Sequence, residues 1–392
     1  MVQPTPMIEG AAHGSGISPG PSVIAVVPGE PYDAHTWAGC SPFFLNALER
    51  LGCLAGAVGA VVPPLQHKAI AAVLAHPKPN LWRFRANGNV LQRRLATHYG
   101  LRKLACIDPS SYDTILQVLA LLDFTGIRGK RTVSYNDTNL LAMTKFYPEV
   151  ANPNSRVVRS ALRYEAGVYE RTDLLFTMSR WAADTFIRDV GIKASKLEPI
   201  GAGINVADPE PFPEKRYDRK NILFVGREFY RKGGYTLLEA FERVRAEMPE
   251  ATLTLIGSAD VPPVPPGVTS LGFVSKRTQA GAQTIRDAYR DASVFVLPSL
   301  WEPFGIAILE AQAHALPCVG SDAFAMPELI RDAEAGYVIA RKDSASLARA
   351  LLSLLKDPTA CAQMGANGRR RQREYHTWAG VAQRIRDGLA RT

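Results

Sequence analysis

Strand-length apolar runs alternate with stretches of helical period along nearly the whole chain. This alternation constrains the fold more than any other feature. Runs such as 23–28 and 221–225 are rich in Val, Ile, Leu and Phe, as expected for strands that are buried on both faces. Segments such as 156–171 and 234–247 place apolar side chains at helical spacing. Parallel strands joined by helices are the natural result, so the predicted class is α/β with doubly wound sheets.

The complete pattern predicts two domains of similar size. A Pro-rich, acidic segment at 208–214 interrupts it, and 392 residues are enough for two cores. We expect a flexible tail over 1–20, a first domain over 21–205, a second over 206–376, and a last helix over 377–392 that packs back on the first domain after an Arg-rich turn at 369–373. The expected strands are 23–28, 132–136, 174–178, 221–225, 252–256, 294–297 and 317–320; the expected helices are 42–51, 156–171, 182–190, 234–247, 305–314, 344–356 and 378–390.

The positive charge is concentrated in one stretch. The chain has a net charge of +9, and residues 51–107 contain eight Lys and Arg but no Asp or Glu. That stretch is mostly helical in pattern, and its partner is expected to be anionic. Five scattered cysteines form no disulfide or zinc pattern, the first residues lack a signal peptide, and no apolar run reaches the ~20 residues of a spanning helix. We expect a cytoplasmic protein, either free or bound at the inner face of a membrane.

Several common site motifs are missing. Neither the segment after residue 28 nor that after residue 226 contains G-x-G-x-x-G, and the chain has no P-loop. These absences argue against a nicotinamide dehydrogenase and a P-loop enzyme. G-x-S-x-G and H-E-x-x-H are also missing, which argues against hydrolases and zinc proteases. There is no D-x-D pair to hold a cation on a diphosphate, so no metal is expected.

A basic loop follows the predicted strand 221–225. Arg227 lies at the carboxyl end of that strand, where open α/β sheets bind ligands, and Lys232 lies at the start of the next helix. A guanidinium, an ammonium and a helix N-terminus could together hold a diphosphate without a metal. The alternative is that both are solvated surface charges.

Two glutamates surround the start of a later helix. Glu302 follows the strand 294–297, and Glu310 lies on the helix that begins near Pro303. The first amides of that helix, at Gly305, Ile306 and Ala307, would be free to donate to hydroxyl or phosphate oxygens. Taken alone, the two carboxylates could equally be favourable contacts with the helix dipole.

The order of these motifs resembles a known family. G-R-x4-K-G at 226–233, L-G-F at 271–273, the strand into L-P-S at 297–299 and E-P-F-G-I-A-I-L-E at 302–310 are similar to the C-terminal domain of the family-4 retaining glycosyltransferases of GT-B fold, in the group 1 glycosyl transferases. The resemblance is dense over 220–360. It is looser in the first half, where 37–52 resembles the family's first loop and helix and 177–205 its last N-domain segment.

The resemblance implies that a nucleotide-diphosphate sugar binds the second domain and a hydroxyl acceptor the first. In these terms Arg227 and Lys232 bind the diphosphate, Glu310 the ribose and Glu302 the donor sugar. Retention of configuration is implied, without a cofactor or a metal. The implied catalytic set is Glu302, Asp137, Arg227 and Lys232; the implied donor-site residues are Gly39, Gly226, Arg227, Lys232, Phe273, Val274, Glu302, Phe304, Gly305, Ile306, Ala307 and Glu310.

Two departures limit this transfer of roles. Where many relatives carry a histidine after a middle strand of the first domain, this chain has Asp137, which could take the acceptor-side role or cap the next segment. His35 is a further possible acceptor contact. Phe324 and Ala325 stand where relatives commonly have two glycines, which makes this loop stiffer and bulkier than theirs.

The sequence therefore predicts a metal-independent, retaining glycosyltransferase of polysaccharide, glycolipid or other glycoconjugate biosynthesis. Two alternatives remain open: an epimerase or hydrolase of nucleotide sugars with the same fold, and a sugar-nucleotide-binding subunit without turnover. The basic stretch 51–107 lies on the acceptor side. We therefore expect it to meet an anionic membrane surface or a lipid-linked, anionic acceptor rather than nucleic acid, unless it is simply a solvated basic surface.

Overall fold

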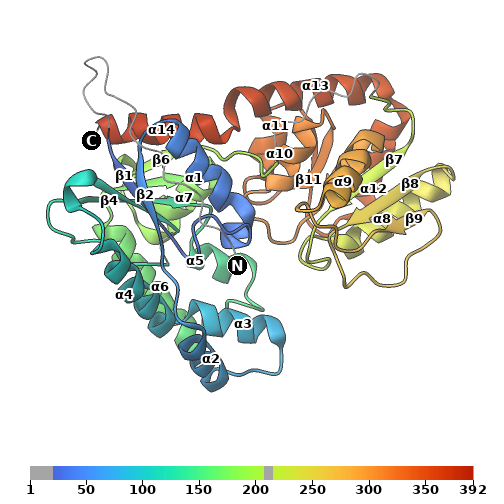
Figure 1. The fold of residues 1–392 in the computed structure, drawn as a ribbon. Coiled ribbons are helices and arrows are strands. Elements are labelled where there is room, and N and C mark those ends of the chain that lie inside the picture. Colours follow the sequence, from blue (N-terminus) through green and yellow to red (C-terminus); the bar gives the residue numbers. More distant parts are fainter. Residues whose placement is uncertain (1–20, 120, 207–214, 392) are drawn as a thin grey trace, which may run out of the picture.

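The computed structural model describes residues 21–119, 121–206 and 215–391. The expected tail over 1–20 and the expected linker segment at 208–214 lie outside these residues. The described chain forms two α/β lobes side by side, each with a parallel six-stranded sheet (Figure 1). No described helix is both long enough and apolar enough to cross a bilayer.

The first sheet has the order β2-β1-β3-β4-β5-β6. The buried strands β1 and β3 are neighbours in its interior and pair in parallel. Helices cover the sheet and pack on its apolar side chains. The strands are Val23–Val27 (β1), Leu54–Gly59 (β2), Thr114–Val118 (β3), Arg131–Asn136 (β4), Leu174–Thr177 (β5) and Leu197–Pro199 (β6); the helices are Cys40–Arg50 (α1), Pro64–Val73 (α2), Pro79–Gly88 (α3), Val90–Leu104 (α4), Leu140–Phe146 (α5), Arg156–Arg171 (α6) and Arg180–Thr185 (α7).

The second sheet has the order β12-β11-β10-β7-β8-β9, again all parallel. Its strand order reverses between β7 and β10, as that of the first sheet reverses between β1 and β3. The strands are Asn221–Val225 (β7), Thr252–Ile256 (β8), Val268–Ser270 (β9), Val294–Leu297 (β10), Cys318–Ser321 (β11) and Gly336–Ile339 (β12); the helices are Gly234–Glu247 (α8), Gln279–Asp291 (α9), Ile306–Ala313 (α10), Met326–Arg331 (α11), Ser344–Lys356 (α12), Pro358–Tyr375 (α13) and Trp378–Arg391 (α14).

The last two helices connect the lobes. The helix α13 lies along the second lobe, and α14 lies beside α1 of the first (Figure 1). The indole N–H of Trp378 donates to the Ile204 carbonyl at 2.9 Å, and the Trp378 ring packs on Phe44. The prediction of an Arg-rich turn at 369–373 is wrong, because these arginines lie in the last turns of α13.

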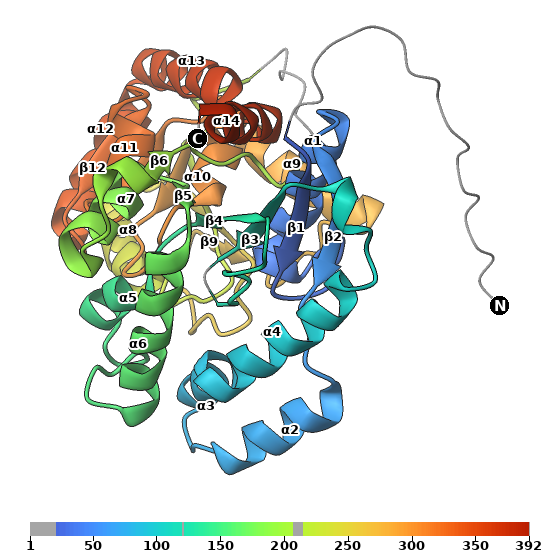
Figure 2. The same cartoon turned by 90° about the vertical axis from the view of Figure 1, so that its left-hand side faces the viewer.

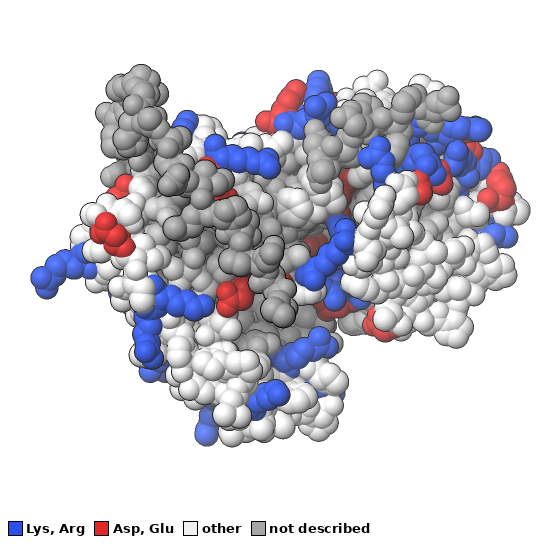
Figure 3. All heavy atoms as spheres, in the orientation of Figure 1, with Lys and Arg blue, Asp and Glu red and all other residues white. Residues whose placement is uncertain are grey.

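The basic stretch is helical, as expected, except for β2 at its start. Its helices α2, α3 and α4 form the lower part of the first lobe (Figure 2). On the face shown in Figure 3, the part that carries α2 and α3 is mostly Lys, Arg and uncharged surface. We name the helices α2 to α4 of the first domain the helical lobe. It lies on the first-domain side of the space between the two sheets.

Candidate functional site

A cavity of about 1860 Å³ lies between the two lobes. From the second lobe it is lined by the loops after β7 and β10, by parts of 273–289 and by α10. From the first lobe it is lined by the loop before α1, by α3 and by the start of α5. The loops after β7 and β10 begin where the strand order reverses, which is where open α/β sheets bind ligands.

The loop after β7 brings its cations to this cavity. It ends at Gly233, which precedes α8 with φ +78°. A Cβ there would lie 2.0 Å from the Pro298 carbonyl oxygen, so this close turn requires glycine. Arg227, Arg231 and Lys232 all line the cavity. Burial and the neighbouring Arg231 lower the pKa of Lys232 well below its usual value.

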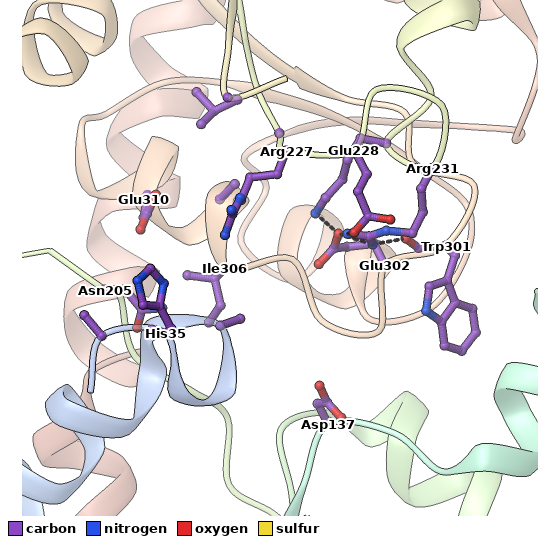
Figure 4. Close-up of a pocket in the computed structure, with 18 of the residues that line it drawn as sticks. His35, Asp137, Asn205, Arg227, Glu228, Arg231, Trp301, Glu302, Ile306 and Glu310 are labelled. Atoms are coloured by element: carbon purple, nitrogen blue, oxygen red, sulfur yellow. Dashed lines mark hydrogen bonds and ion pairs between the residues drawn. The ribbon is translucent and has the colours of Figure 1, made fainter. Parts of the chain in front are cut away.

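Glu302 and Lys232 are direct partners. The Lys232 ammonium donates to a Glu302 carboxylate oxygen, and Arg231 lies 3.5 Å from the same oxygen (Figure 4). Arg231 also donates to the Trp301 carbonyl at 2.7 Å and pairs with Glu228 at 3.1 Å. Sequence reasoning assigned Lys232 and Glu302 to different parts of a ligand. It missed Arg231, which the sequence marked only as the neighbour of Lys232 at the end of the loop.

Arg227 lies between the two carboxylates in the close-up (Figure 4). Its guanidinium stacks over the Phe273 ring at 5.2 Å, and Phe273 is 59% exposed. Gly226 and Val274 line the same part of the cavity. The predicted diphosphate and base residues are therefore neighbours, although their roles stay predictions.

Glu310 is buried and is held in position by hydrogen bonds from two neighbouring side chains. It is 3% exposed and accepts hydrogen bonds from Lys276 at 2.5 Å and from the Tyr289 hydroxyl at 3.4 Å. His314 stacks on the Tyr289 ring at 4.3 Å, and burial lowers its pKa to about 4, so its imidazole is neutral at pH 7. Sequence reasoning did not identify Lys276, Tyr289 or His314.

The first turn of α10 faces the cavity only in part. Ile306 and Ala307 line it, whereas Phe304 and Gly305 are not among its lining residues, and the Phe304 ring is buried 6.2 Å from the His376 ring. Gly305 directly precedes the helix with φ +103°. The expected donation from the Phe304 and Gly305 amides stays a prediction.

Asp137 lies across the cavity from Glu302 and Trp301 (Figure 4). It follows β4 and is half-buried. Burial raises the pKa of Asp137 to about 6, although hydrogen bonding from its own and the Thr138 backbone opposes the shift. It does not occupy the N-cap position of α5, which belongs to Asn139. A carboxylate with this pKa is suited to exchange a proton near neutral pH.

Three consecutive residues before α1 have left-handed backbone: Trp37, Ala38 and Gly39, with φ of 51°, 54° and 87°. The Trp37 ring fixes this loop by packing against Phe44 at 5.8 Å and Tyr135 at 5.3 Å. Left-handed backbone of non-glycine residues costs free energy, and proteins retain it mainly at functional sites. Gly39 both caps α1 and lines the cavity, so the same glycine serves the start of the helix and lies where a ligand would approach.

His35 and Asn205 lie together at this edge of the cavity (Figure 4). The Asn205 amide nitrogen is 3.2 Å from the Cys40 sulfur, and its buried Oδ1 has no hydrogen-bond partner in the described part of the chain. The Asn205 Oδ1 is thus an acceptor that a ligand could use. Sequence reasoning did not identify Asn205, which was only the last residue of the predicted first domain. Within the described ranges, no group of three or more His, Cys, Asp or Glu is placed to hold a metal ion.

Comparison with known proteins finds similar sequences. Residues 219–357 match the family model described as glycosyl transferases group 1. The chain is 29% identical over 247 residues to alpha-maltose-1-phosphate synthase of Mycolicibacterium smegmatis, covering 56% of this chain and 63% of that protein. It is 33% identical over 195 residues to phosphatidyl-myo-inositol mannosyltransferase of Mycobacterium leprae, covering 47% and 51%. The chain thus spans roughly half to three fifths of these curated relatives.

Solved structures match over nearly the whole chain. Sucrose-phosphate synthase from Thermosynechococcus elongatus has a TM-score of 0.71 at 19% identity, covering 94% of this chain and 98% of that one. Anabaena HepE, solved with UDP and glucose, has a TM-score of 0.64 at 16% identity, covering 94% and 99%. The predicted GT-B fold, two doubly wound domains facing each other across a cleft, is confirmed.

Proposed function

We propose that this protein is a glycosyltransferase that moves a sugar from a nucleotide-diphosphate sugar to a hydroxyl acceptor. One observation carries the proposal: two cations and two carboxylates in the family's motif order, Arg227, Lys232, Glu302 and Glu310, line one wall of an interdomain cavity. The group 1 match over 219–357 covers all four. HepE, which has the same fold, was solved in complex with UDP-glucose, and this supports a nucleotide-sugar donor.

The proposed donor position follows the charges. Arg227, Lys232 and the first amides of α10 bind the diphosphate, and Glu310 accepts from the ribose hydroxyls. Glu302 binds the donor sugar near the reacting carbon. Lys232 forms an ion pair with Glu302, which offsets its charge. A diphosphate brings negative charge to Lys232 and favours its protonated form.

We further propose that transfer is metal-independent and retains the anomeric configuration. The bond from the anomeric carbon to the phosphate oxygen breaks as the acceptor oxygen bonds to that carbon from the same face, and the leaving phosphate takes the acceptor proton. Arg227 and Lys232 stabilise the charge that develops on the diphosphate. Asp137 faces this point from the acceptor side and orients the hydroxyl.

The acceptor belongs to the first lobe, beside the basic stretch, and we propose a polysaccharide, glycolipid or other glycoconjugate precursor. An anionic or lipid-linked acceptor fits the charge of 51–107. We accordingly propose that the enzyme acts in the cytoplasm, at the inner face of a membrane. The names of the relatives, which include a phosphatidylinositol mannosyltransferase, support that class of substrate.

The test is a screen of nucleotide sugars by thermal shift, followed by mass spectrometry of products with candidate acceptors. Lys232→Ala and Glu302→Ala should each lower turnover by about 10²–10³, the usual loss when a group that stabilises transition-state charge is removed. Lys356→Ala is the matched control, because this exposed lysine lies at the end of α12. Near-normal transfer by both site variants would overturn the assignment.

A further inference from the structure

A second cavity lies in the first lobe, separate from the candidate site. It measures about 860 Å³, within the range of small-molecule pockets, and lies between α2, the start of α4 and the start of α6. We name it the α2 groove. Its floor is apolar and its polar rim is basic, with no acidic lining residue: it is lined by Ala69, Ile70, Val73, Leu74, Asn89, Val90, Leu91, Arg156, Val157, Arg159, Ser160 and Arg163.

The helix α2 has an apolar composition but no buried residue. Every one of its ten residues is at least partly exposed, and Val73 is 86% exposed. Across the groove, Leu91 is 57% exposed. A helix of this composition normally buries an apolar stripe against a core, so the exposed face of α2 is suited to hydrocarbon.

The basic rim comes from one face of α6. Arg156, Arg159 and Arg163 are spaced along its first two turns, and all three are exposed. In the described ranges, neither Arg156 nor Arg163 forms an ion pair with a carboxylate, and the Arg159 side chain donates to the Asn154 carbonyl. Guanidinium groups in this arrangement suit a phosphate.

We propose that the α2 groove binds one acyl chain of an anionic membrane lipid while the α6 arginines bind its headgroup phosphate, so that the helical lobe rests on an anionic membrane. Apolar side chains on the floor favour hydrocarbon over a nucleic acid, whose backbone would need polar contacts there. The groove also adjoins the acceptor side of the large cavity, since Gly88 lines that cavity and Asn89 lines the groove. The inference does not depend on transferase activity.

Vesicle binding tests the charged rim. The protein should bind vesicles that mix phosphatidylglycerol with phosphatidylcholine at low salt, and pure phosphatidylcholine weakly. Each arginine near an anionic surface contributes about fivefold, so the double variant Arg156→Glu/Arg163→Glu should partition at least about 25-fold less. Arg216→Glu, an exposed arginine of the second lobe, should bind as the unaltered protein does.

A monomeric lipid tests the groove itself. Lysophosphatidylglycerol below its micelle concentration should bind saturably with one site, and glycerol phosphate, which lacks the chain, should not. Val73→Ser/Leu91→Ser should weaken lysophosphatidylglycerol about tenfold, whereas Leu101→Ser, which alters an exposed leucine outside the groove, should not.

Three results would overturn the proposal: recruitment to phosphatidylcholine alone, loss of vesicle binding by the Arg216 control, or duplex DNA binding as tight as vesicle binding. Absence of saturable lysophosphatidylglycerol binding would overturn the groove assignment. The substituted side chains are exposed, and unchanged thermal unfolding would show that each variant folds. Since no turnover is measured, failure here leaves the glycosyltransferase proposal standing.

Discussion

Asp137 is a site residue whose charge is at odds with its surroundings. Burial raises the pKa of its carboxyl to about 6 in the folded protein, above its usual 3.8. The folded state therefore binds this proton more tightly than the unfolded state. The stability that protonation provides is lost as the pH rises through about 6, so the charged carboxylate destabilises the fold at neutral pH. This is the pattern expected where a site residue is kept for function rather than for stability.

Asp137→Asn should therefore be more stable than the unaltered protein at pH 8, by about 1–2 kcal/mol after discounting for partial exposure, and the gain should shrink towards pH 4. Urea unfolding across this pH range measures it. Transfer activity should fall in the variant, and in the unaltered protein it should decline as the pH drops below about 6. A variant with the same gain at pH 4 and pH 8 would contradict the assigned titration.

Glu310 is the residue whose proposed partner can be tested by changing the ligand. Glu310→Gln should weaken the nucleoside diphosphate that binds best by about tenfold or more, the usual effect of losing a hydrogen bond to a charged group. The same nucleotide lacking both ribose hydroxyls should bind the unaltered protein weakly and the variant no worse. Calorimetry of the four pairs gives the coupling. Zero coupling would remove Glu310 from the ribose.

The loop before α1 is the element whose strained backbone points to ligand contact. Gly39→Ala should cost about 1–2 kcal/mol of stability because its φ is +87°, and it should also lower donor affinity because the loop faces the cavity. Gly126→Ala is the matched control: φ there is +79°, and a Cβ would meet nothing within 4 Å. Equal donor affinities in the two variants would show that the loop does not approach the ligand.

At the scale of elements, the sequence predicted best where a strand is a continuous apolar run. The bounds of β7, β8 and β10 match those read from the pattern. The strand β2 was missed because Leu54–Gly59 is mostly Ala and Gly, which have low strand propensity. The strand β3, Thr114–Val118, was also missed. The helix α13 was missed because arginines and glycines conceal its buried face.

The same distinction applies to the candidate site. The motif residues Arg227, Lys232, Glu302 and Glu310 line one cavity, as expected from their order in the chain. Their partners were not visible, because a contact such as Tyr289 with Glu310 joins positions on different elements. The motif residues in the loops at strand ends can be recognised from the local sequence. The side chains that hold them in place cannot, because these contacts depend on how distant elements pack.

At the scale of the whole molecule, an aromatic cluster joins the two lobes. Phe324 of the second lobe is buried between Phe146 and Trp181 of the first, at 5.1 and 5.2 Å between ring centres, and Trp301 packs on it at 4.9 Å. Phe324 has φ +62°, in the region that favours glycine. The departure from the two glycines expected there thus has a structural reason: the bulky ring is an interdomain contact.

Ion pairs extend this contact. Glu328 accepts from the Arg180 and Trp181 backbone N–H groups at 3.1 and 3.2 Å, and the Arg180 side chain pairs with Asp332. Burial raises the pKa of Glu328, and the hydrogen bonds from the first lobe oppose that shift. These contacts between the two lobes therefore lie beside the cavity, and Trp301, which lines the cavity, also packs on Phe324.

Weakening this interface should open the molecule without harming the donor site. Arg180→Ala/Phe324→Leu should raise the radius of gyration in small-angle scattering and lower turnover severalfold, because the acceptor side no longer meets the donor. Donor affinity should stay within about threefold, since the proposed donor contacts come mainly from the second lobe. Arg188→Ala is the matched control, because Arg188 pairs with Asp189 within the first lobe. If the double variant had the same radius of gyration as this control, the cluster would not hold the two lobes together. If the double variant lost donor affinity as well as turnover, the contact between the lobes would be part of the donor site itself.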